Sequence, residues 1–156
     1  IKFGATTPSF DLETAIDTEY PVEHINEEIV KQVLDSFVGE IEQVPPIFSA
    51  KNINGKRAYT KARKGEKIEL DSVKITIKSI EIIDFELPLL VFKILCSKGT
   101  YIRSLANDIG KATNSGAHLV ALRRTKSGDI NVENAVTIEM FTEYLKKVKQ
   151  NFNSNV

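Results

Sequence analysis

The sequence predicts an α+β fold with a mixed, mainly antiparallel sheet and flanking helices. Segments in which apolar and polar residues alternate are interspersed with single segments of helical periodicity. Two alternating segments, 73–85 and 89–96, are separated only by a short turn with Pro88, which is typical of an antiparallel hairpin. The regular strand–helix alternation of a doubly wound parallel sheet is missing.

Residues that begin or end elements support these assignments. Asn26 is a suitable N-cap, the two glutamates after it favour the positive end of a helix, and Gly39 is a natural stop. Gly110, near the end of another helix, costs about 1 kcal/mol relative to alanine. The expected order is strand end 2–7, turn 8–11, helix 26–38, strand 41–44, loop 52–55, short helix 56–64, strands 67–70, 73–85 and 89–96, helix 99–114, strand 117–124, turn 127–129 and helix 138–149.

The composition is that of a folded domain without a membrane partner. The chain has 156 residues, 42% of them hydrophobic, and apolar runs such as 87–92 are far shorter than the roughly 20 residues that a membrane helix needs. The single cysteine, Cys96, excludes a disulfide framework and favours a reducing compartment, the cytoplasm. The chain opens on Ile1 and passes at once into the end of a strand, so we expect either an N-terminal truncation or a preceding segment that is not recorded.

Charge is unevenly distributed along this chain, whose formal net charge is zero. Residues 1–50 contain ten acidic and two basic residues, whereas residues 51–67 contain seven basic residues and one acidic residue. Residues 98–126 contain six basic residues and one acidic residue. The two basic segments form either an electrostatic footprint for a polyanion or two solvated faces.

General catalytic and ligand-binding patterns give no function. The sequence has no P-loop, no dinucleotide fingerprint and no nucleophile elbow. His24 and His118 lack a ligand partner at metal-binding spacing, so no metal site is expected. Cys96 lies in a predicted strand and is most simply a small buried hydrophobe.

Longer motifs are more informative than these general patterns. They are Phe-Gly-Ala-Thr-Thr-Pro-Ser-Phe-Asp at 3–11, Pro-Val-Glu-His-Ile at 21–25, Gln-Val-Pro-Pro-Ile-Phe-Ser-Ala at 43–50, Asn-Gly-Lys-Arg-Ala-Tyr at 54–59, Cys-Ser-Lys-Gly-Thr-Tyr-Ile-Arg-Ser-Leu at 96–105 with Asp-Ile-Gly at 108–110, Gly-Ala-His-Leu at 116–119, and Leu-Arg-Arg-Thr at 122–125. Together these motifs closely resemble, in order, those of the bacterial TruB-type tRNA pseudouridine synthases, and the resemblance covers nearly all of Phe3 to Ala135. Any one motif is moderately specific, whereas the whole series is hard to obtain by chance.

The resemblance implies a fold, a reaction and a partner. The sheet would be part of the pseudouridine synthase catalytic fold, with a basic thumb insertion at about 45–68. The enzyme would isomerise a T-loop uridine of tRNA, uridine 55, to pseudouridine without a cofactor. An aspartate attacks the flipped uridine, the glycosidic bond breaks, the base turns, and C5 rejoins the sugar. The partner would be the T arm of tRNA.

The resemblance also assigns roles to particular residues. Arg103 is expected to pair with the catalytic aspartate and hold its pKa down, and Tyr101 to lie beside the pocket of the flipped base. Tyr101 is alternatively a core tyrosine satisfied through its hydroxyl. Leu122 would line the same pocket, and Lys98 would face phosphate or the active site. Asp11 matches a position near the displaced T-loop nucleotides, or is simply a turn-forming aspartate.

The role of Arg103 has physical support beyond the resemblance, and the thumb residues are basic. Arg103 lies near the positive end of a predicted helix, where a cation is electrostatically disfavoured. A residue placed there despite this cost indicates a functional role. Lys56, Arg57 and Arg63 belong to the basic thumb, and the resemblance implies that such residues contact phosphates of the T arm. Contacts of this kind give affinity and salt sensitivity but little sequence discrimination.

The catalytic aspartate itself has no candidate. The family places it in a Leu-Asp-Pro motif, and the only Leu-Asp pairs, Leu34–Asp35 and Leu70–Asp71, lack the surrounding residues. We therefore expect the nucleophile, and the tyrosine that stacks on the target base, in residues before Ile1. Residues 1–150 would form a partial catalytic domain, inactive alone, followed by a C-terminal tail at 151–156 and no complete PUA domain.

Two other functions remain open at this stage. A non-catalytic tRNA- or RNA-binding module would keep the basic segments without the aspartate. A protein-interaction domain would have the same segments as solvated faces. A truncated sheet also leaves an unpaired edge, so we expect the isolated chain to self-associate or to have a disordered thumb.

Overall fold

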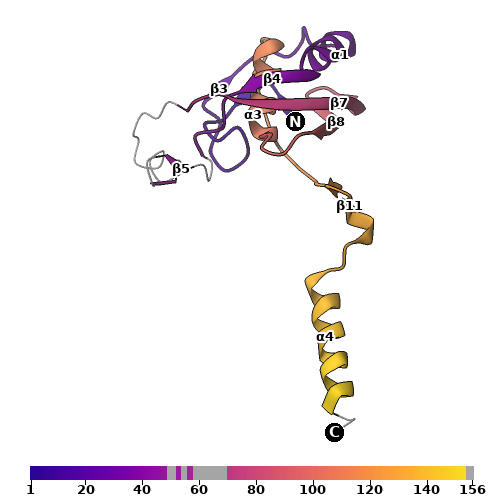
Figure 1. Cartoon of the computed structure of the whole chain (residues 1–156). Coiled ribbons are helices and arrows are strands. Elements are labelled where there is room, and N and C mark those ends of the chain that lie inside the picture. Colours follow the sequence, from indigo (N-terminus) through magenta and orange to yellow (C-terminus); the bar gives the residue numbers. More distant parts are fainter. Residues whose placement is uncertain (49–51, 54–55, 58–69, 154–156) are drawn as a thin grey trace. The chain divides into compact units, whose positions relative to one another are not determined.

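A computed structural model describes residues 1–48, 52–53, 56–57 and 70–153 (Figure 1). The chain divides into two compact units, Ile1–Ala121 and Leu122–Val156, which are taken separately below. The first unit contains the sheet, two helices and all of the long-range side-chain contacts discussed here.

A five-stranded sheet forms the frame of the first unit. Its strand order is β4-β7-β8-β1-β9, and every neighbouring pair is antiparallel. Two helices pack with it, so the predicted α+β class with a mainly antiparallel sheet is confirmed. The strands are β1 (Lys2–Phe3), β4 (Gly39–Gln43), β7 (Val73–Glu86), β8 (Leu89–Cys96) and β9 (Ala117–His118).

The β7–β8 hairpin matches its prediction closely. Strand β8 has the predicted bounds, and β7 ends one residue beyond them. The alternating pattern is correct as well, since Ile75 and Ile77 are buried and Lys74 and Thr76 are exposed. This alternation gives the sheet one face that packs on the core.

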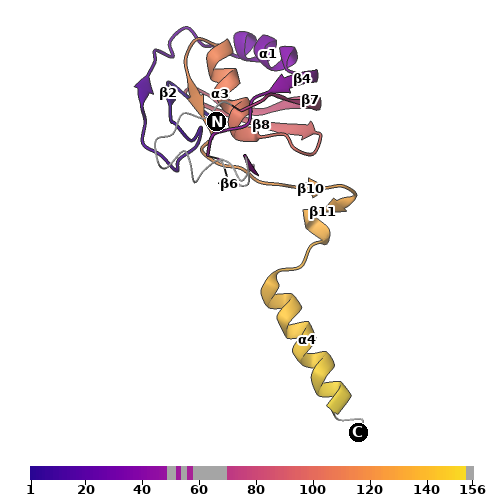
Figure 2. The same cartoon turned by 60° about the vertical axis from the view of Figure 1, so that its left-hand side comes forward.

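The helices α1 (Glu27–Ser36) and α3 (Ile102–Ala112) cover that face (Figure 2). Asn26 is the N-cap of α1, as predicted, and its side-chain oxygen accepts a hydrogen bond from the Ile29 amide at 2.9 Å. Helix α1 ends earlier than expected, because Phe37 is its C-cap and Gly39 is the first residue of β4. Helix α3 starts at Ile102 instead of residue 99.

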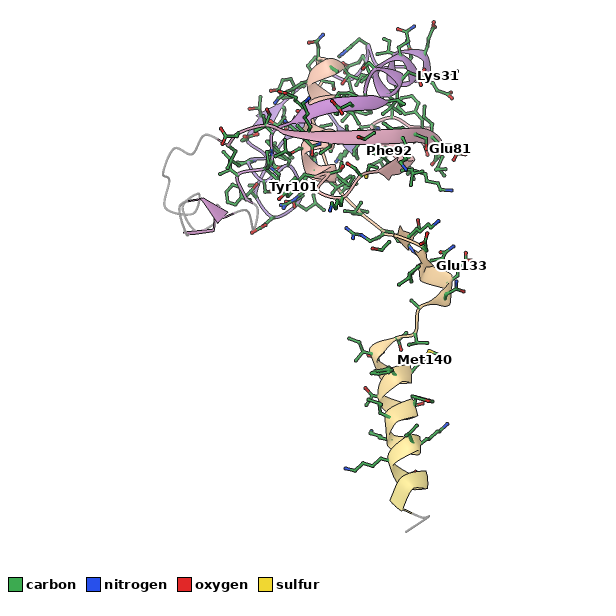
Figure 3. The ribbon with its side chains drawn as sticks, viewed as in Figure 1. Lys31, Glu81, Phe92, Tyr101, Glu133 and Met140 are labelled. Atoms are coloured by element: carbon green, nitrogen blue, oxygen red, sulfur yellow. The ribbon has the colours of Figure 1, made fainter. Side chains whose placement is uncertain are left out.

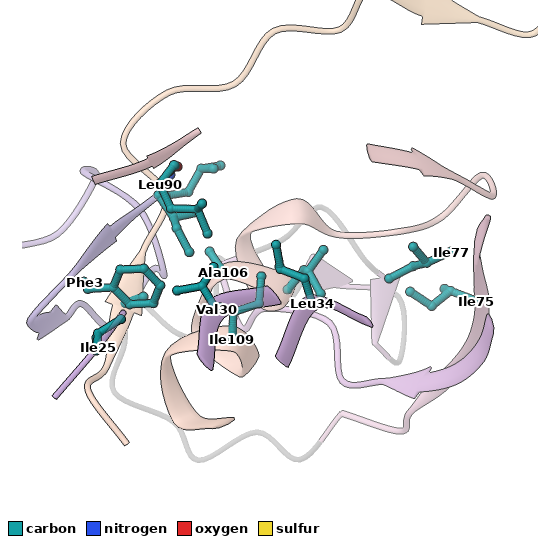
Figure 4. Packing of buried hydrophobic residues seen from close by; sticks show 13 residues of the cluster. Phe3, Ile25, Val30, Leu34, Ile75, Ile77, Leu90, Ala106 and Ile109 are labelled. Carbon is teal, nitrogen blue, oxygen red and sulfur yellow. The ribbon is translucent and has the colours of Figure 1, made fainter. Parts of the chain in front are cut away.

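The core lies between the two helices and the inner face of the sheet. Figure 4 shows Val30 of α1 beside Ala106 and Ile109 of α3, with Phe3 of β1 close by. Each of these side chains is at most 1% exposed. The same cluster includes Ile77 and Leu90 from the sheet, so both helices bury their apolar faces against one set of strands.

Gly110 is required by the approach of α3 to the segment before β9. A Cβ atom at this position would lie 2.1 Å from the Ala117 nitrogen and 2.5 Å from the Gly116 carbonyl carbon. The expected helix-propensity cost of this glycine is therefore offset by close packing that no larger residue permits.

Two predicted elements, the strand 117–124 and the helix 56–64, are wrong in part. The predicted strand 117–124 stops at His118, because only Ala117–His118 find a partner, in β1. The predicted helix 56–64 is wrong at its start, since Lys56–Arg57 form strand β6 and pair with β5 (Asn52–Ile53), which was expected to be loop. Leu70 is not in a strand, and the rest of 67–70 lies outside the described residues.

The remaining elements are short, apart from the last helix. Strands β2 (Ala5–Thr6) and β3 (Thr18–Glu19) form a two-stranded sheet in the first unit. In the second unit, β10 (Lys126–Ser127) and β11 (Ile130–Asn131) enclose the predicted turn, and a 3-10 helix follows at Val132–Asn134.

Helix α4 (Ile138–Asn153) closes the described part of the second unit. It runs four residues beyond its predicted end, so the first three residues of the predicted tail, 151–153, are helical. No helix within the described ranges is long and apolar enough to cross a membrane.

Candidate functional site

The first turn of α3 carries an ion pair between Arg103 and Asp11. The Arg103 Nη1 atom donates a hydrogen bond to Asp11 Oδ2 at 3.0 Å. Both side chains are about three-quarters covered, with 24% and 23% of their areas exposed. A charge-assisted bond in such a setting is stronger than an exposed ion pair, because water screens it less. Asp11 also offsets the cost of a cation near the positive end of a helix.

A tightly bonded turn presents Asp11 to the arginine. Thr7 Oγ1 donates to the Asp11 carbonyl oxygen at 2.7 Å, and the Glu13 amide donates to Asp11 Oδ1 at 2.9 Å. Within the same turn, the Ser9 and Thr14 hydroxyl oxygens lie 2.9 Å apart, and each accepts a hydrogen bond from the other residue's amide. These bonds hold Asp11 in place without any contribution from Arg103.

The backbone just before Asp11 is strained. Phe10 has a φ angle of 63°, in the left-handed region that bulky residues avoid. Such a conformation costs on the order of 1–3 kcal/mol and persists only where the surroundings impose it. Here the Phe10 carbonyl oxygen accepts a hydrogen bond from the Leu119 amide at 2.9 Å, which ties the turn to the segment after β9.

The environment keeps Asp11 ionised. Burial alone would raise the pKa of its carboxyl group, but hydrogen bonds from Ser9 and from the Glu13 amide, together with the charge and hydrogen bond of Arg103, lower the pKa below its usual value. The carboxylate therefore keeps its charge, and with it the pairing to Arg103, at neutral pH.

The segment that follows β4 forms the other wall around Arg103. Arg103 Nη2 donates to the Phe48 carbonyl oxygen at 3.0 Å, and Ser104 Oγ donates to the Val44 carbonyl oxygen at 2.8 Å. Pro45 and Pro46, between these two carbonyl groups, are fully buried. The guanidinium group is thus oriented from two sides, by a carboxylate and by a backbone carbonyl.

Gln43, the last residue of β4, holds Tyr101, the N-cap residue just before α3. Its side chain is 1% exposed. The Tyr101 amide donates to Gln43 Oε1 at 2.8 Å, and Gln43 Nε2 donates to the Tyr101 carbonyl oxygen at 3.2 Å. Tyr101 lies toward the end of the sheet where β4 finishes, away from Glu81 and Phe92 on the hairpin (Figure 3).

The structure brings together three of the residues singled out from the sequence. Arg103 and Asp11 are in direct contact, and Tyr101 begins the helix that carries Arg103, with its side chain half-buried. Lys98 is exposed in the turn between β8 and α3. Leu122 falls in the second unit with 63% of its area exposed, so its place in a pocket stays a prediction.

The thumb residues are described only in part. Lys56 and Arg57 belong to β6, and Arg63 lies outside the described residues. Their contacts with phosphates remain predictions.

Sequence reasoning missed the partners that hold Arg103 and Tyr101 in place. Gln43 was part of a family motif without a role of its own. A signal for it existed, because alternation along β4 places Ile41 and Gln43 on the same, inward face, and a buried amide needs partners. The Phe48 carbonyl had no such signal, since any residue type supplies a backbone oxygen.

Chemically, the arrangement suits an anion. A guanidinium group that is about three-quarters covered, and that is oriented by Asp11 and the Phe48 carbonyl, can hold a second carboxylate or a phosphate through a planar fork of donors. Among the described residues, no group of three or more histidine, cysteine, aspartate and glutamate side chains is placed to hold a metal ion.

Comparison with known proteins places both halves of the chain in one family. The model of the TruB family pseudouridylate synthase N-terminal domain matches residues 1–102, and that of the tRNA pseudouridylate synthase B C-terminal domain matches residues 103–155. Together the two matches span the first unit and most of the second.

Individual proteins agree with these matches. The chain is 53% identical to tRNA pseudouridine synthase B of Phocaeicola vulgatus over 93% of this chain and 62% of that protein. It is 57% identical to the protein of the same name from Flavobacterium johnsoniae, over 92% and 62%. The chain thus spans somewhat less than two thirds of the length of these relatives.

A solved structure has a similar fold. One chain in the crystal structure of a Cbf5-Nop10-Gar1 complex superimposes with a TM-score of 0.64 and 30% sequence identity. The match covers 81% of this chain and 34% of that chain.

Proposed function

Because this chain belongs to the TruB family of pseudouridine synthases, we propose that the protein converts a uridine in the T loop of tRNA to pseudouridine. The relatives that carry the name tRNA pseudouridine synthase B support this substrate class. The substrate would be the folded T arm, recognised by shape, with the target base taken out of the stack.

The observation that carries the proposal is the setting of Arg103. This residue matches the family's arginine. Its side chain extends from the start of α3, is about three-quarters covered, and is fixed by Asp11 and the Phe48 carbonyl. A nucleophilic carboxylate placed beside this guanidinium group would stay ionised, because an adjacent cation that cannot lose its proton lowers the carboxyl pKa.

The reaction would depend on positioning and charge. An aspartate attacks the flipped uridine, the glycosidic bond breaks, and the base turns. C5 then joins the sugar and loses its proton, and the bond to the aspartate breaks, which restores the free carboxylate. Arg103 would hold the aspartate, Tyr101 would lie beside the base, and Leu122 would be an apolar wall of the pocket. Lys98 and the thumb residues Lys56, Arg57 and Arg63 would contact phosphates. No cofactor is needed in this scheme.

The nucleophile has no candidate among these 156 residues, so the chain alone would be inactive. The proposal is therefore tested on the protein encoded by the complete reading frame. We place this protein in the cytoplasm, where its single cysteine fits and tRNA is available. Self-association of the chain through an unpaired sheet edge also stays a prediction.

The test measures tritium release from tRNA transcripts labelled at C5 of uridine, since only a new bond at C5 releases that hydrogen. Arg103→Ala should lower turnover by at least roughly 100-fold, because a charge that orients the nucleophile is lost. The dissociation constant for tRNA should change by less than about 3-fold, because most affinity comes from phosphate contacts elsewhere. Lys78→Ala, an exposed residue of β7, is the matched control.

The outcomes separate the candidate functions. Equal loss of turnover and tRNA binding in Arg103→Ala would make Arg103 a structural residue and contradict the assigned role. Wild-type protein that binds tRNA but releases no tritium would contradict the enzyme and favour a non-catalytic RNA-binding module.

A further inference from the structure

Packing alone does not explain why a glutamine stands at the buried position 43. Its side chain is 1% exposed, and the two side-chain hydrogen bonds that it makes within the described residues both end on the backbone of Tyr101. Burying a primary amide costs free energy unless each polar atom finds a partner. A methionine would fill a similar volume at this inward position of β4 without that cost. The amide therefore contributes geometry that an apolar side chain cannot supply.

That geometry concerns the start of α3. Tyr101 is the N-cap of this helix, and its own side chain makes no capping hydrogen bond. In a capping box, the third helical residue reaches back to the amide of the N-cap residue. Here the third residue is Ser104, and its hydroxyl donates to the Val44 carbonyl oxygen instead. Gln43 accepts a hydrogen bond from the Tyr101 amide. A residue of β4 therefore satisfies the N-cap amide that no side chain of α3 satisfies.

We propose that Gln43 is a positioning residue of the active site, which fixes the first turn of α3 so that Tyr101 and Arg103 face the target base and the nucleophile. This inference rests on the proposed function. Arg103 lies two residues after the clamped Tyr101, on the same helical turn. A tilt of that turn would move the guanidinium group away from Asp11 and from the Phe48 carbonyl, which belong to other segments of the chain.

The main experiment compares Gln43→Met with wild type in the protein from the complete reading frame. Gln32→Met, an exposed glutamine of α1, is the matched control. We expect Gln43→Met to lower kcat by roughly 10- to 100-fold, because displacements of about 1 Å have effects of this size. KM should change by less than about 3-fold, because phosphate contacts elsewhere supply most of the affinity. A folded Gln43→Met protein with wild-type kcat would overturn the proposal.

A conservative variant separates positioning from stability. The protonated carboxyl group of Gln43→Glu can accept from the Tyr101 amide and donate to the Tyr101 carbonyl, whereas the ionised group can only accept. Burial would keep this group protonated to a higher pH than usual. The kcat of Gln43→Glu relative to wild type should therefore recover at low pH and fall as pH rises. For Gln43→Met we expect the ratio of its kcat to the wild-type kcat to be independent of pH. The same independence in Gln43→Glu would contradict the role of the Gln43–Tyr101 hydrogen bonds.

A third measurement does not depend on the enzyme activity. The pKa of Asp11, followed by carbon-13 NMR of its carboxyl group, reports whether Arg103 is still beside it. We expect this pKa to rise in Gln43→Met and to stay at the wild-type value in Gln32→Met. An unchanged Asp11 pKa in folded Gln43→Met protein would overturn the positioning role, even if the wild-type enzyme showed no turnover and the proposed function had failed.

Discussion

Arg103 and Asp11 are 92 residues apart in the chain, and their side chains meet at 3.0 Å. The pair joins the helix that follows the hairpin to the turn that follows β2. Because each partner is also held by backbone groups, the arginine by the Phe48 carbonyl and the aspartate by the Glu13 amide, neither side chain depends on the other alone for its orientation.

Removing the charge of Asp11 should destabilise the first unit. In Asp11→Asn the arginine keeps its burial but loses its anionic partner, which should cost about 1–3 kcal/mol, as for a partly buried hydrogen bond to a charged group. Urea unfolding at neutral pH measures this difference. Asp35→Asn, on the exposed side of α1, should lie within about 0.5 kcal/mol of wild type. Equal stability of Asp11→Asn and wild type would show that the pair contributes only orientation.

The same pair should make stability depend on pH in acid. The folded state lowers the pKa of Asp11, so the unfolded state binds its proton first as pH falls. The contribution of Asp11 to the free energy of unfolding is therefore fully present above its pKa in the unfolded state, about 3.9. It is lost as pH falls through its pKa in the folded state. Urea midpoints measured between neutral pH and pH 3 should fall less steeply in Asp11→Asn than in wild type. Parallel curves would exclude a lowered Asp11 pKa.

Gly110→Ala should be strongly destabilising although alanine favours helices. The helix propensity gain is about 1 kcal/mol, but the new Cβ would lie 2.1 Å from a backbone nitrogen that cannot move without shifting β9. We expect a net loss of about 3 kcal/mol in thermal or urea unfolding. Ala112→Gly, at the exposed end of the same helix, should cost no more than about 1 kcal/mol. Stability of Gly110→Ala above that of wild type would disprove the close approach.

Binding of tRNA to the complete protein should weaken as salt rises, in proportion to the number of phosphates that the protein neutralises. Replacing Lys56, Arg57 and Arg63 with glutamine should reduce the slope of log Kd against log salt by about 0.7–0.9 for each phosphate that is no longer neutralised. The weakening should be similar for different tRNA sequences, because phosphate contacts do not read bases. A triple variant with an unchanged slope would leave the basic segment as a solvated face.

Local elements were predictable from the sequence, whereas long-range contacts were not. The bounds of β8 and the Asn26 cap follow from patterns within a few residues, and both predictions are correct. The predicted strand 117–124 failed beyond His118, because strand formation needs a partner and only β1 provides one. Arg103 was singled out through the family motif, and nothing in the sequence indicated that Asp11 would be its partner.

This difference between local elements and long-range contacts has a physical reason. Alternation and capping are properties of neighbouring residues, so one sequence contains them. The contacts of Arg103 with Asp11 and of Gln43 with Tyr101 depend on how the sheet orders its strands, which periodicity does not specify. Only for Gln43 did the sequence indicate that a long-range partner exists, because a polar residue on the inward face of a strand needs a hydrogen-bond partner.

The hydrogen bonds around α3 also bear on when the site can form during folding. They join residues 55 to 92 positions apart, and each must wait until the intervening chain has closed its loop. A chain still emerging from the ribosome would have its hairpin before it has an oriented Arg103. Competence to hold an anion at Arg103 would then be among the last properties acquired, and a partly folded molecule would lack the oriented guanidinium group on which the proposed reaction depends.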